Sequence, residues 1–164
     1  MRLLLIEDDE AYQLAMAAHL RHLSGVVAVD RAVDGEQGLE ILEHRAVDLV
    51  LLDLVLPGMG GLATCERISN QSIPVLVLTS QDDPDWIQRI WHAGATGYLH
   101  KERAFEQVEL ALASLRAGAS WWDQRATAAM RAPITSDAAS VLEAKRHPHP
   151  PRTSGPGVPG CWRQ

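Results

Sequence analysis

Cysteines are few in this sequence, and long apolar runs are missing. Its 164 residues include two cysteines, Cys65 and Cys161, whose wide separation offers no metal-binding pattern, so we expect reduced thiols without a functional role. Apolar runs such as LVLL at 49–52 are far shorter than the roughly 20 residues that a membrane-spanning helix needs. The N-terminal stretch MRLLLIEDDE turns acidic early and lacks the cleavage region of a signal peptide. These absences predict a cytoplasmic protein that does not associate with membranes.

Basic charge is also scarce in most of the chain. Residues 1–117 hold 9 lysines and arginines against 18 aspartates and glutamates, a formal balance of −9, whereas residues 118–164 carry +3. Proteins that bind nucleic acid neutralise its phosphates with basic side chains. Direct DNA binding by the acidic part is therefore not expected, and we interpret the weakly basic end as a solvated tail.

Short apolar runs alternate with segments that have helical spacing. Strands are expected at 2–7, 26–33, 47–53, 73–80 and 96–100, and helices at 10–23, 34–44, about 61–70, 82–94 and 104–118. A repeated strand–helix order indicates a parallel sheet with helices on both faces, because each crossover connection is right-handed. We therefore expect an α/β fold with a doubly wound, five-stranded parallel sheet.

The composition divides the chain into three parts. Residues 1–118 contain all the strand–helix repeats and are expected to form one domain. Residues 119–146 could carry one or two short helices. Residues 147–164 contain five prolines and three glycines, a composition that does not support a packed core. We expect this last part to be a disordered tail.

Polar residues follow the expected strands. Asp8 and Asp9 follow the first strand, Asp53 ends the third, Thr79 lies at the end of the fourth, and Lys101 follows the fifth. Ligands of open parallel sheets bind outside the carboxyl ends of the strands. These five side chains are therefore expected to converge on one site.

The expected site combines a metal-binding group with a nucleophile. Three neighbouring carboxylates repel one another unless a cation joins them, and oxygen ligands favour Mg²⁺ completed by water and a phosphate oxygen. Asp53 could then accept a phosphoryl group as a mixed anhydride, while Lys101 and Thr79 stabilise the charge that develops on it.

Four stretches of residues 1–117 resemble the receiver domain of bacterial two-component response regulators. These are LLLIEDDE, DLVLLDLVLPGMGGL, VLVLTS and AGATGYLHK. The resemblance implies a flavodoxin-like (βα)5 fold with strand order 2-1-3-4-5. It also implies that Asp8 and Asp9 bind Mg²⁺, that Asp53 is the phosphoacceptor and a metal ligand, and that the backbone carbonyl of Val55 completes the metal site.

The resemblance further implies how the domain signals. A sensor histidine kinase would supply the phosphoryl group, and the domain would catalyse only the phosphorylation and dephosphorylation of its own aspartate. Lys101 would pair with the phosphoryl group, Thr79 would be the switch hydroxyl, and Tyr98 the switch aromatic residue. Their movement would repack the face formed by the helix at 82–94, the strand at 96–100 and the helix at 104–118.

The helix expected at 82–94 carries more apolar surface than its core position requires. Ile87, Ile90 and Trp91 follow one helical stripe, and Trp86 and Trp91 cannot easily both be buried. One tryptophan is therefore expected on an association surface, which suggests a homodimer formed through the face described above.

Simpler interpretations of the site residues remain open. Asp8 and Asp9 could cap the helix that follows them, Lys101 could be a solvated turn residue, and Tyr98 a plain core or surface aromatic residue. Glu7 precedes the acidic pair and is expected to point away from the site.

The region after residue 118 resembles part of a LuxR-type transcriptional regulator. RAGASWWDQRATAAM resembles its linker helix, and ITSDAASVL at 134–142 resembles the start of its helix-turn-helix domain. A recognition helix should follow, but HPHPPRTSGPGVPG cannot form one because proline interrupts a helix. We expect a truncated or frame-shifted output domain and no DNA binding by this chain.

A flavin-binding relative of the same fold would need a phosphate-binding loop after the first strand, where EDDEAY would repel a phosphate in the absence of metal. Two other functions also compete with the receiver interpretation. The first is a LuxR-type DNA-binding regulator with a divergent output domain. The second is an aspartate-nucleophile phosphatase of the haloacid dehalogenase type. That phosphatase requires a second acid two residues after the nucleophile, where this chain has Val55.

Overall fold

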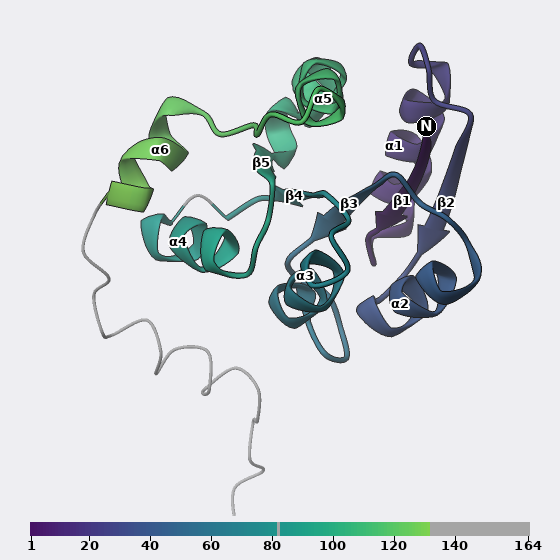
Figure 1. The fold of residues 1–164 in the computed structure, drawn as a ribbon, viewed down its shortest axis with the longest axis horizontal. Helices are drawn as coiled ribbons and strands as arrows, with labels where there is room; N and C mark the ends of the chain where they lie inside the picture. The colour runs from purple at the N-terminus through teal and green to yellow at the C-terminus, as the bar shows by residue number, and fades with distance from the viewer. Residues whose placement is uncertain (82, 132–164) are drawn as a thin grey trace, which may run out of the picture. The chain divides into compact units, whose positions relative to one another are not determined.

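The computed structural model describes residues 1–81 and 83–131 (Figure 1). The expectations for 132–146 and for the tail at 147–164 lie outside the described residues. The strands are β1 (Arg2–Ile6), β2 (Ala28–Ala32), β3 (Leu49–Asp53), β4 (Val75–Thr79) and β5 (Gly97–His100). The helices are α1 (Glu10–His22), α2 (Gly35–His44), α3 (Gly61–Ser69), α4 (Pro84–His92), α5 (Lys101–Arg116) and α6 (Gln124–Arg131). No helix among the described residues has the length and apolar character needed to cross a membrane.

The strands form one parallel sheet in the order β2-β1-β3-β4-β5. This confirms the α/β fold and the strand order expected from the sequence. β3 and β4 are buried at every position, as expected for strands that helices cover on both faces. Because all strands are parallel, their carboxyl ends lie together at one end of the sheet.

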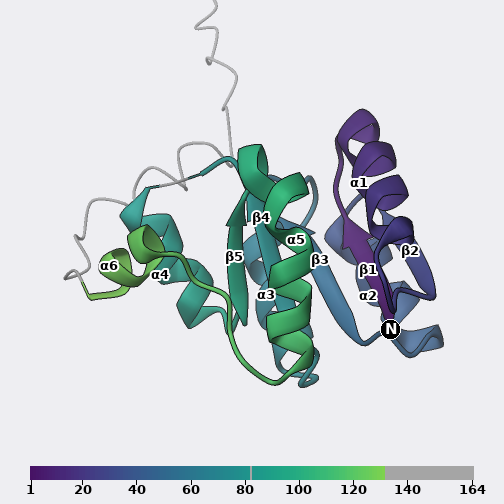
Figure 2. The ribbon, with the colours of Figure 1, turned by 90° about the horizontal axis from the view of Figure 1, so that it is seen from above.

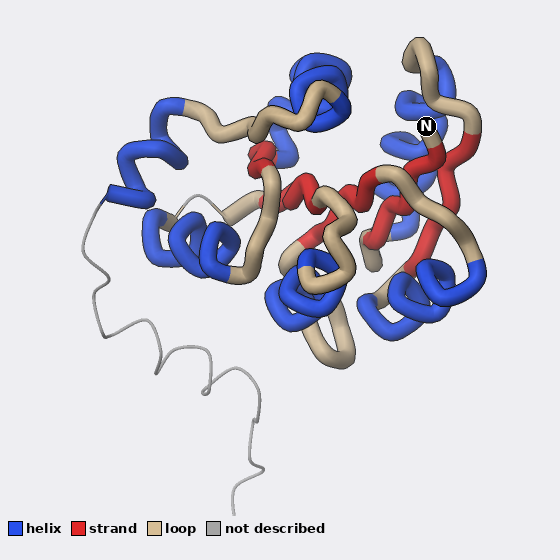
Figure 3. The backbone as a smooth tube through the Cα atoms, in the orientation of Figure 1, coloured by secondary structure: helices blue, strands red, loops and turns tan. Residues whose placement is uncertain are grey.

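Successive side chains of each strand alternate between two apolar layers. Leu5 and Leu51 pack with residues of α1 and α5, whereas Val50 and Leu52 pack with residues of α3 and α4. Figure 3 shows the same division, with α1 and α5 on one side of the sheet and α2, α3 and α4 on the other. The two layers hold the helices against the sheet and so fix the positions of the loops at its carboxyl end.

The two helices near the site, α1 and α5, begin in different ways. Asp9 caps α1 by accepting a hydrogen bond from the Tyr12 backbone N–H at 3.0 Å. α5 begins at Lys101, directly after β5, rather than at the expected residue 104. Lys101 therefore lies in the first turn of a helix, where its side chain has a defined direction.

The chain continues past α5 along the outer edge of the sheet. Trp121 forms an isolated parallel bridge with Gly97 of β5, and α6 then packs on α4 (Figure 2). The helix lies within the 119–146 segment for which short helices were expected. The division of the chain at residue 118 stays a prediction.

Two adjacent glycines allow α3 to approach the end of β3. A Cβ atom at Gly61 would overlap the Asp53 carbonyl oxygen and the Leu54 Cα atom. At Gly60, a Cβ would meet nothing within 4 Å, but the φ angle is +79°. Gly61 is therefore required for space and Gly60 for its backbone conformation.

We expect Gly61→Ala to lower the free energy of unfolding by about 3 kcal/mol, because its methyl group would be forced against backbone atoms. Gly60→Ala should cost about 2 kcal/mol, because a φ of +79° with a ψ of 159° is a backbone conformation that residues with a side chain rarely adopt. Urea denaturation followed by circular dichroism measures both values. A loss well below about 1 kcal/mol in Gly61→Ala would show that position 61 has room for a methyl group.

Candidate functional site

Three carboxylates converge where β1 and β3 end. Glu7, Asp8 and Asp53 each offer one oxygen, and these oxygens lie within 4.8 Å of one another. Glu7 is 1% and Asp53 is 3% exposed, whereas Asp8 is open to solvent. An ionised carboxylate is costly to bury without a partner. The two buried acids therefore require positive charge or hydrogen-bond donors close to them.

Lys101 supplies the positive charge. Its Nζ lies 2.9 Å from Glu7 Oε1, 2.8 Å from Glu7 Oε2 and 2.9 Å from Asp53 Oδ2. The ring of Tyr12 lies beside the ammonium group, with its centroid 4.8 Å from Nζ. Asp53 Oδ1 accepts a hydrogen bond from the Leu54 backbone N–H at 2.7 Å. Both oxygens of the buried Asp53 carboxylate therefore have a donor.

The alternation of strand side chains explains why Glu7 and Asp53 meet. Leu5 and Leu51 are paired neighbours in β1 and β3, and both face the layer formed by α1 and α5. Two residues further along, Glu7 and Asp53 point toward the same layer, where Lys101 begins α5. The expectation that Glu7 points away from the site is therefore wrong. The period of two along the first strand was the signal that could have revealed it.

Asp9 has a different environment from the other acids of this loop. Its carboxylate caps α1, and its backbone N–H donates to Glu7 Oε1 at 3.3 Å. The acids that cluster with Asp53 are Glu7 and Asp8, one position earlier than the pair Asp8 and Asp9 chosen from the sequence. The helix-cap interpretation describes the contacts of Asp9.

Thr79 and Tyr98 are both buried and are connected through Gln81. The Gln81 backbone N–H donates to Thr79 Oγ1 at 3.1 Å, and the Tyr98 hydroxyl donates to the Gln81 carbonyl at 3.2 Å. Val55 lies in the loop after β3 with an exposed side chain. The switch roles of Thr79 and Tyr98, and the metal role of the Val55 carbonyl, stay predictions.

Burial and charge act in opposite directions at the central ion pair. Burial raises the pKa of Glu7; the hydrogen bond from Lys101 opposes this change, and the charge of Asp53 adds to it. For Lys101, burial lowers the pKa, but the bonds and charges of Glu7 and Asp53 outweigh burial, so the pKa is raised. Lys101 therefore stays protonated, and Glu7 keeps its proton to a higher pH than an exposed glutamate does.

The three carboxylates are suitable ligands for a divalent cation. When ionised, the three carboxylates and one ammonium leave two negative charges in the cluster. Glu7 Oε2 is buried and accepts no well-formed hydrogen bond from the described residues, although Lys101 Nζ is near enough for an ion pair. Carboxylate oxygens are the ligands that hard cations such as Mg²⁺ select. Glu7, Asp8 and Asp53 could therefore hold such an ion.

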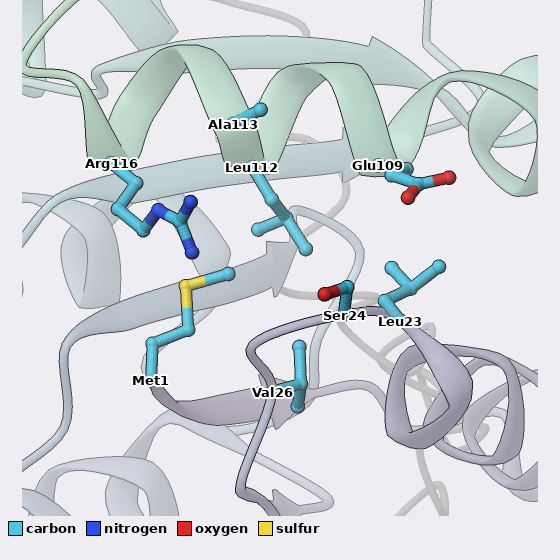
Figure 4. A pocket seen from close by; sticks show the side chains of 8 residues that line it. All are labelled: Met1, Leu23, Ser24, Val26, Glu109, Leu112, Ala113 and Arg116. Carbon is cyan, nitrogen blue, oxygen red and sulfur yellow. The ribbon is translucent and has the colours of Figure 1, made fainter.

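A separate pocket lies at the opposite end of the strands (Figure 4). It has a volume of about 170 Å³, and its lining includes Met1 at the start of the chain and Leu112 and Arg116 of α5. Aliphatic side chains line it together with the Arg116 guanidinium, the Glu109 carboxylate and the Ser24 hydroxyl, and no residue of the acidic cluster does. The pocket is therefore distinct from the candidate site.

The raised pKa of Glu7 predicts a pH-dependent stability. Above its unfolded value of 4.5, the folded protein still holds a proton that the unfolded chain has released, so this stabilisation is lost as the pH rises through the folded pKa. Glu7→Gln removes the titration. In metal-free buffer, its unfolding free energy relative to wild type should therefore rise as the pH increases from about 4.5 toward neutrality.

Urea denaturation across this pH range measures the effect. Glu10→Gln, at an exposed position in the first turn of α1, is the matched control and should show no such trend. If the relative stability of Glu7→Gln fell as the pH rose, the folded pKa of Glu7 would lie below its unfolded value.

Comparisons with known proteins bear on the family and the fold of this chain. The family described as the response regulator receiver domain matches residues 3–113. Response regulator UvrY of Escherichia coli (strain K12) is 31% identical over 120 residues, which are 72% of this chain and 55% of the relative. Transcriptional regulatory protein QseB of Haemophilus influenzae is 38% identical over 117 residues, 70% of this chain and 52% of the relative. The chain thus spans about half the length of these curated relatives.

A solved structure shares the fold. A two-component response regulator of the LuxR family from Aurantimonas sp. SI85-9A1 superposes with a TM-score of 0.73 and 20% identity, covering 86% of this chain and 97% of that one. At this identity the likeness bears on the fold alone. The match over residues 3–113 covers both strands that carry the acidic cluster and the first turn of α5. The chain belongs to the response regulator receiver family.

Proposed function

We propose that this receiver domain accepts a phosphoryl group on Asp53 from a phosphohistidine of a sensor histidine kinase in the cytoplasm, and so acts as a signalling switch. The observation that carries the proposal is the buried Asp53 carboxylate held 2.9 Å from Lys101 Nζ at the carboxyl end of the sheet. Family membership supports the same chemistry.

The residues around Asp53 suit an in-line transfer. One carboxylate oxygen forms a bond to phosphorus while the P–N bond of the phosphohistidine breaks, and the imidazole leaves with the electron pair and takes up a proton from solvent. Lys101 already contacts Asp53 Oδ2 and can pair with the oxygens of the arriving group. Thr79, at the end of the neighbouring strand β4, is the hydroxyl we propose as a further donor.

We propose Glu7, Asp8 and Asp53, with the backbone carbonyl of Val55, as the residues that hold Mg²⁺. This replaces the pair Asp8 and Asp9, because the Asp9 carboxylate is engaged at the start of α1. When bound, the ion neutralises the charge that the phosphoryl group brings into the cluster.

The competing functions receive less support. Val55 stands where a phosphatase of this mechanism needs a second acid, and an aliphatic side chain cannot transfer a proton. We therefore propose a domain that modifies its own aspartate and not an enzyme with a separate substrate. The segment proposed as a remnant of a DNA-binding domain begins at 134, outside the described residues.

Incubation with Mg²⁺ and acetyl phosphate tests the phosphoacceptor. We expect the intact mass to increase by one phosphoryl group, and Asp53→Ala to abolish the gain because the nucleophile is lost. Asp48→Ala, an exposed aspartate at the opposite end of β3, is the control and should be modified normally. Lys101→Ala should keep metal binding but slow the transfer. A normal mass gain in Asp53→Ala would overturn the assignment.

A pair of amide substitutions tests the metal ligands. Asp8→Asn should weaken Mg²⁺ binding by at least about tenfold, because an anionic ligand is replaced by a neutral one. Asp9→Asn should bind Mg²⁺ normally and remain as stable as wild type, because asparagine caps helices as well as aspartate does. Isothermal titration calorimetry measures both affinities. The reverse pattern would restore Asp9 as the ligand.

A further inference from the structure

Residues 119–131 cover the edge of the sheet that β5 would otherwise expose. The Tyr98 backbone N–H donates to the Trp121 carbonyl at 2.9 Å, and the Trp121 N–H donates to the Thr96 carbonyl at 3.3 Å. Trp121 thus extends the sheet by one bridged residue beyond β5. An edge strand with free backbone groups is a ready site for pairing with another chain. Here the protein's own chain occupies that position.

α6 packs on α4 through small side chains. Ala126 is fully buried and Ala129 is 6% exposed, and both belong to the apolar layer that contains residues of α4. The Gln88 side-chain amide of α4 donates to the Ala129 carbonyl at 2.7 Å. Figure 2 shows α6 lying alongside α4 at the outer side of β5. The contact therefore combines apolar packing with a directed hydrogen bond.

One of the two tryptophans of α4 contacts a tryptophan of the segment that follows α5. Trp91 of α4 lies against Trp122, with ring centroids 5.6 Å apart and an edge-to-face angle of 66°. Trp91 is still 50% exposed. The apolar surface of α4 is therefore only partly covered by the segment that contains Trp122 and α6.

Hydrogen bonds connect this contact to the candidate site. Thr79 Oγ1 accepts from the Gln81 N–H, and the Gln81 carbonyl accepts from the Tyr98 hydroxyl. The Tyr98 ring belongs to the same apolar layer as Ala126 and Ala129. A displacement of the Thr79 hydroxyl can thus affect the surface on which α6 packs, through two hydrogen bonds and the ring of Tyr98.

We propose that residues 119–131 can be displaced from α4 and β5. Phosphorylation of Asp53 weakens the packing of α6 on α4, and packing of α6 on α4 disfavours the phosphorylated state. The inference rests on the proposed function. A phosphoryl group that draws the Thr79 hydroxyl toward itself removes the acceptor of the Gln81 N–H. The Gln81 carbonyl then no longer holds Tyr98 in the position on which α6 packs.

Because coupling between two sites is reciprocal, the proposal can be tested by changing either the phosphorylation site or the packing of α6. If phosphorylation weakens the seating of α6, then unseating α6 must strengthen binding of a phosphoryl analogue by the same factor. The analogue is beryllofluoride, supplied with Mg²⁺ to the full chain. Ala129→Glu places a carboxylate in the buried face of α6, and Ala128→Glu places it on the exposed face of the same helix.

We expect Ala129→Glu to bind beryllofluoride roughly 10-fold more tightly than wild type, within the usual range of coupling between sites. Ala128→Glu should bind as wild type does. Calorimetric titration measures the affinities. Hydrogen exchange measured on the wild-type chain requires no substitution: adding Mg²⁺ and beryllofluoride should accelerate exchange of the amides at 124–131.

Unchanged exchange at 124–131, or equal affinities of the two variants, would overturn the proposal even if Asp53 takes up a phosphoryl group. A loss of beryllofluoride binding in the wild-type chain, together with no mass gain on Asp53, would instead overturn the proposed function and this inference with it. The mass measurement therefore distinguishes the two failures.

Discussion

One ammonium group between two buried carboxylates organises the carboxyl end of this sheet. Lys101 contacts Glu7 and Asp53 at hydrogen-bond distance, and burial of either acid without that charge would be costly. The pairing ties the first turn of α5 to the ends of β1 and β3. It also leaves an excess of negative charge, which is why the same group of residues can accept a divalent cation. Stability and chemistry at this site therefore depend on the same ion pair.

The fold itself followed from patterns that local chemistry enforces. Apolar runs such as that of β3, followed by capped helical segments, were sufficient to predict every strand and the first five helices, because alternation and helical periodicity are properties of neighbouring residues. The start of α5 was less predictable. No side chain caps the helix at His100, so the sequence carries no marker for its beginning. As a result, Lys101 was expected between the last strand and the last helix, and it lies instead in the first turn of α5.

The candidate site shows where reasoning from single motifs goes wrong. Within the run Glu7, Asp8 and Asp9, the three acids are chemically similar, and a motif alone does not say which of them face Asp53. The direction of β1 decides this, because Glu7 continues the face of Leu5, whereas Asp9 is engaged at the start of α1. Similarly, one of Trp86 and Trp91 was expected on an association surface, and the structure adds a contact within the chain, between Trp91 and Trp122 just before α6. The first case depends on how the end of β1 and the start of α1 orient neighbouring acids. The second depends on a contact between residues that are distant in the sequence.

By itself the sequence determined the class of fold, the end of the sheet at which the acidic residues and Lys101 gather, and the residue types of that cluster. These depend on periodicity and on the rule that parallel strands end together. Only the tertiary structure decided that Glu7 joins Asp53 and Lys101, that Gln81 connects Thr79 with Tyr98, and that α6 covers the α4–β5 edge. Such contacts join residues far apart along the chain. Their geometry depends on the register of the strands and on the residue at which each helix begins. A shift of one residue in either would break these contacts, and local sequence patterns do not specify them so closely.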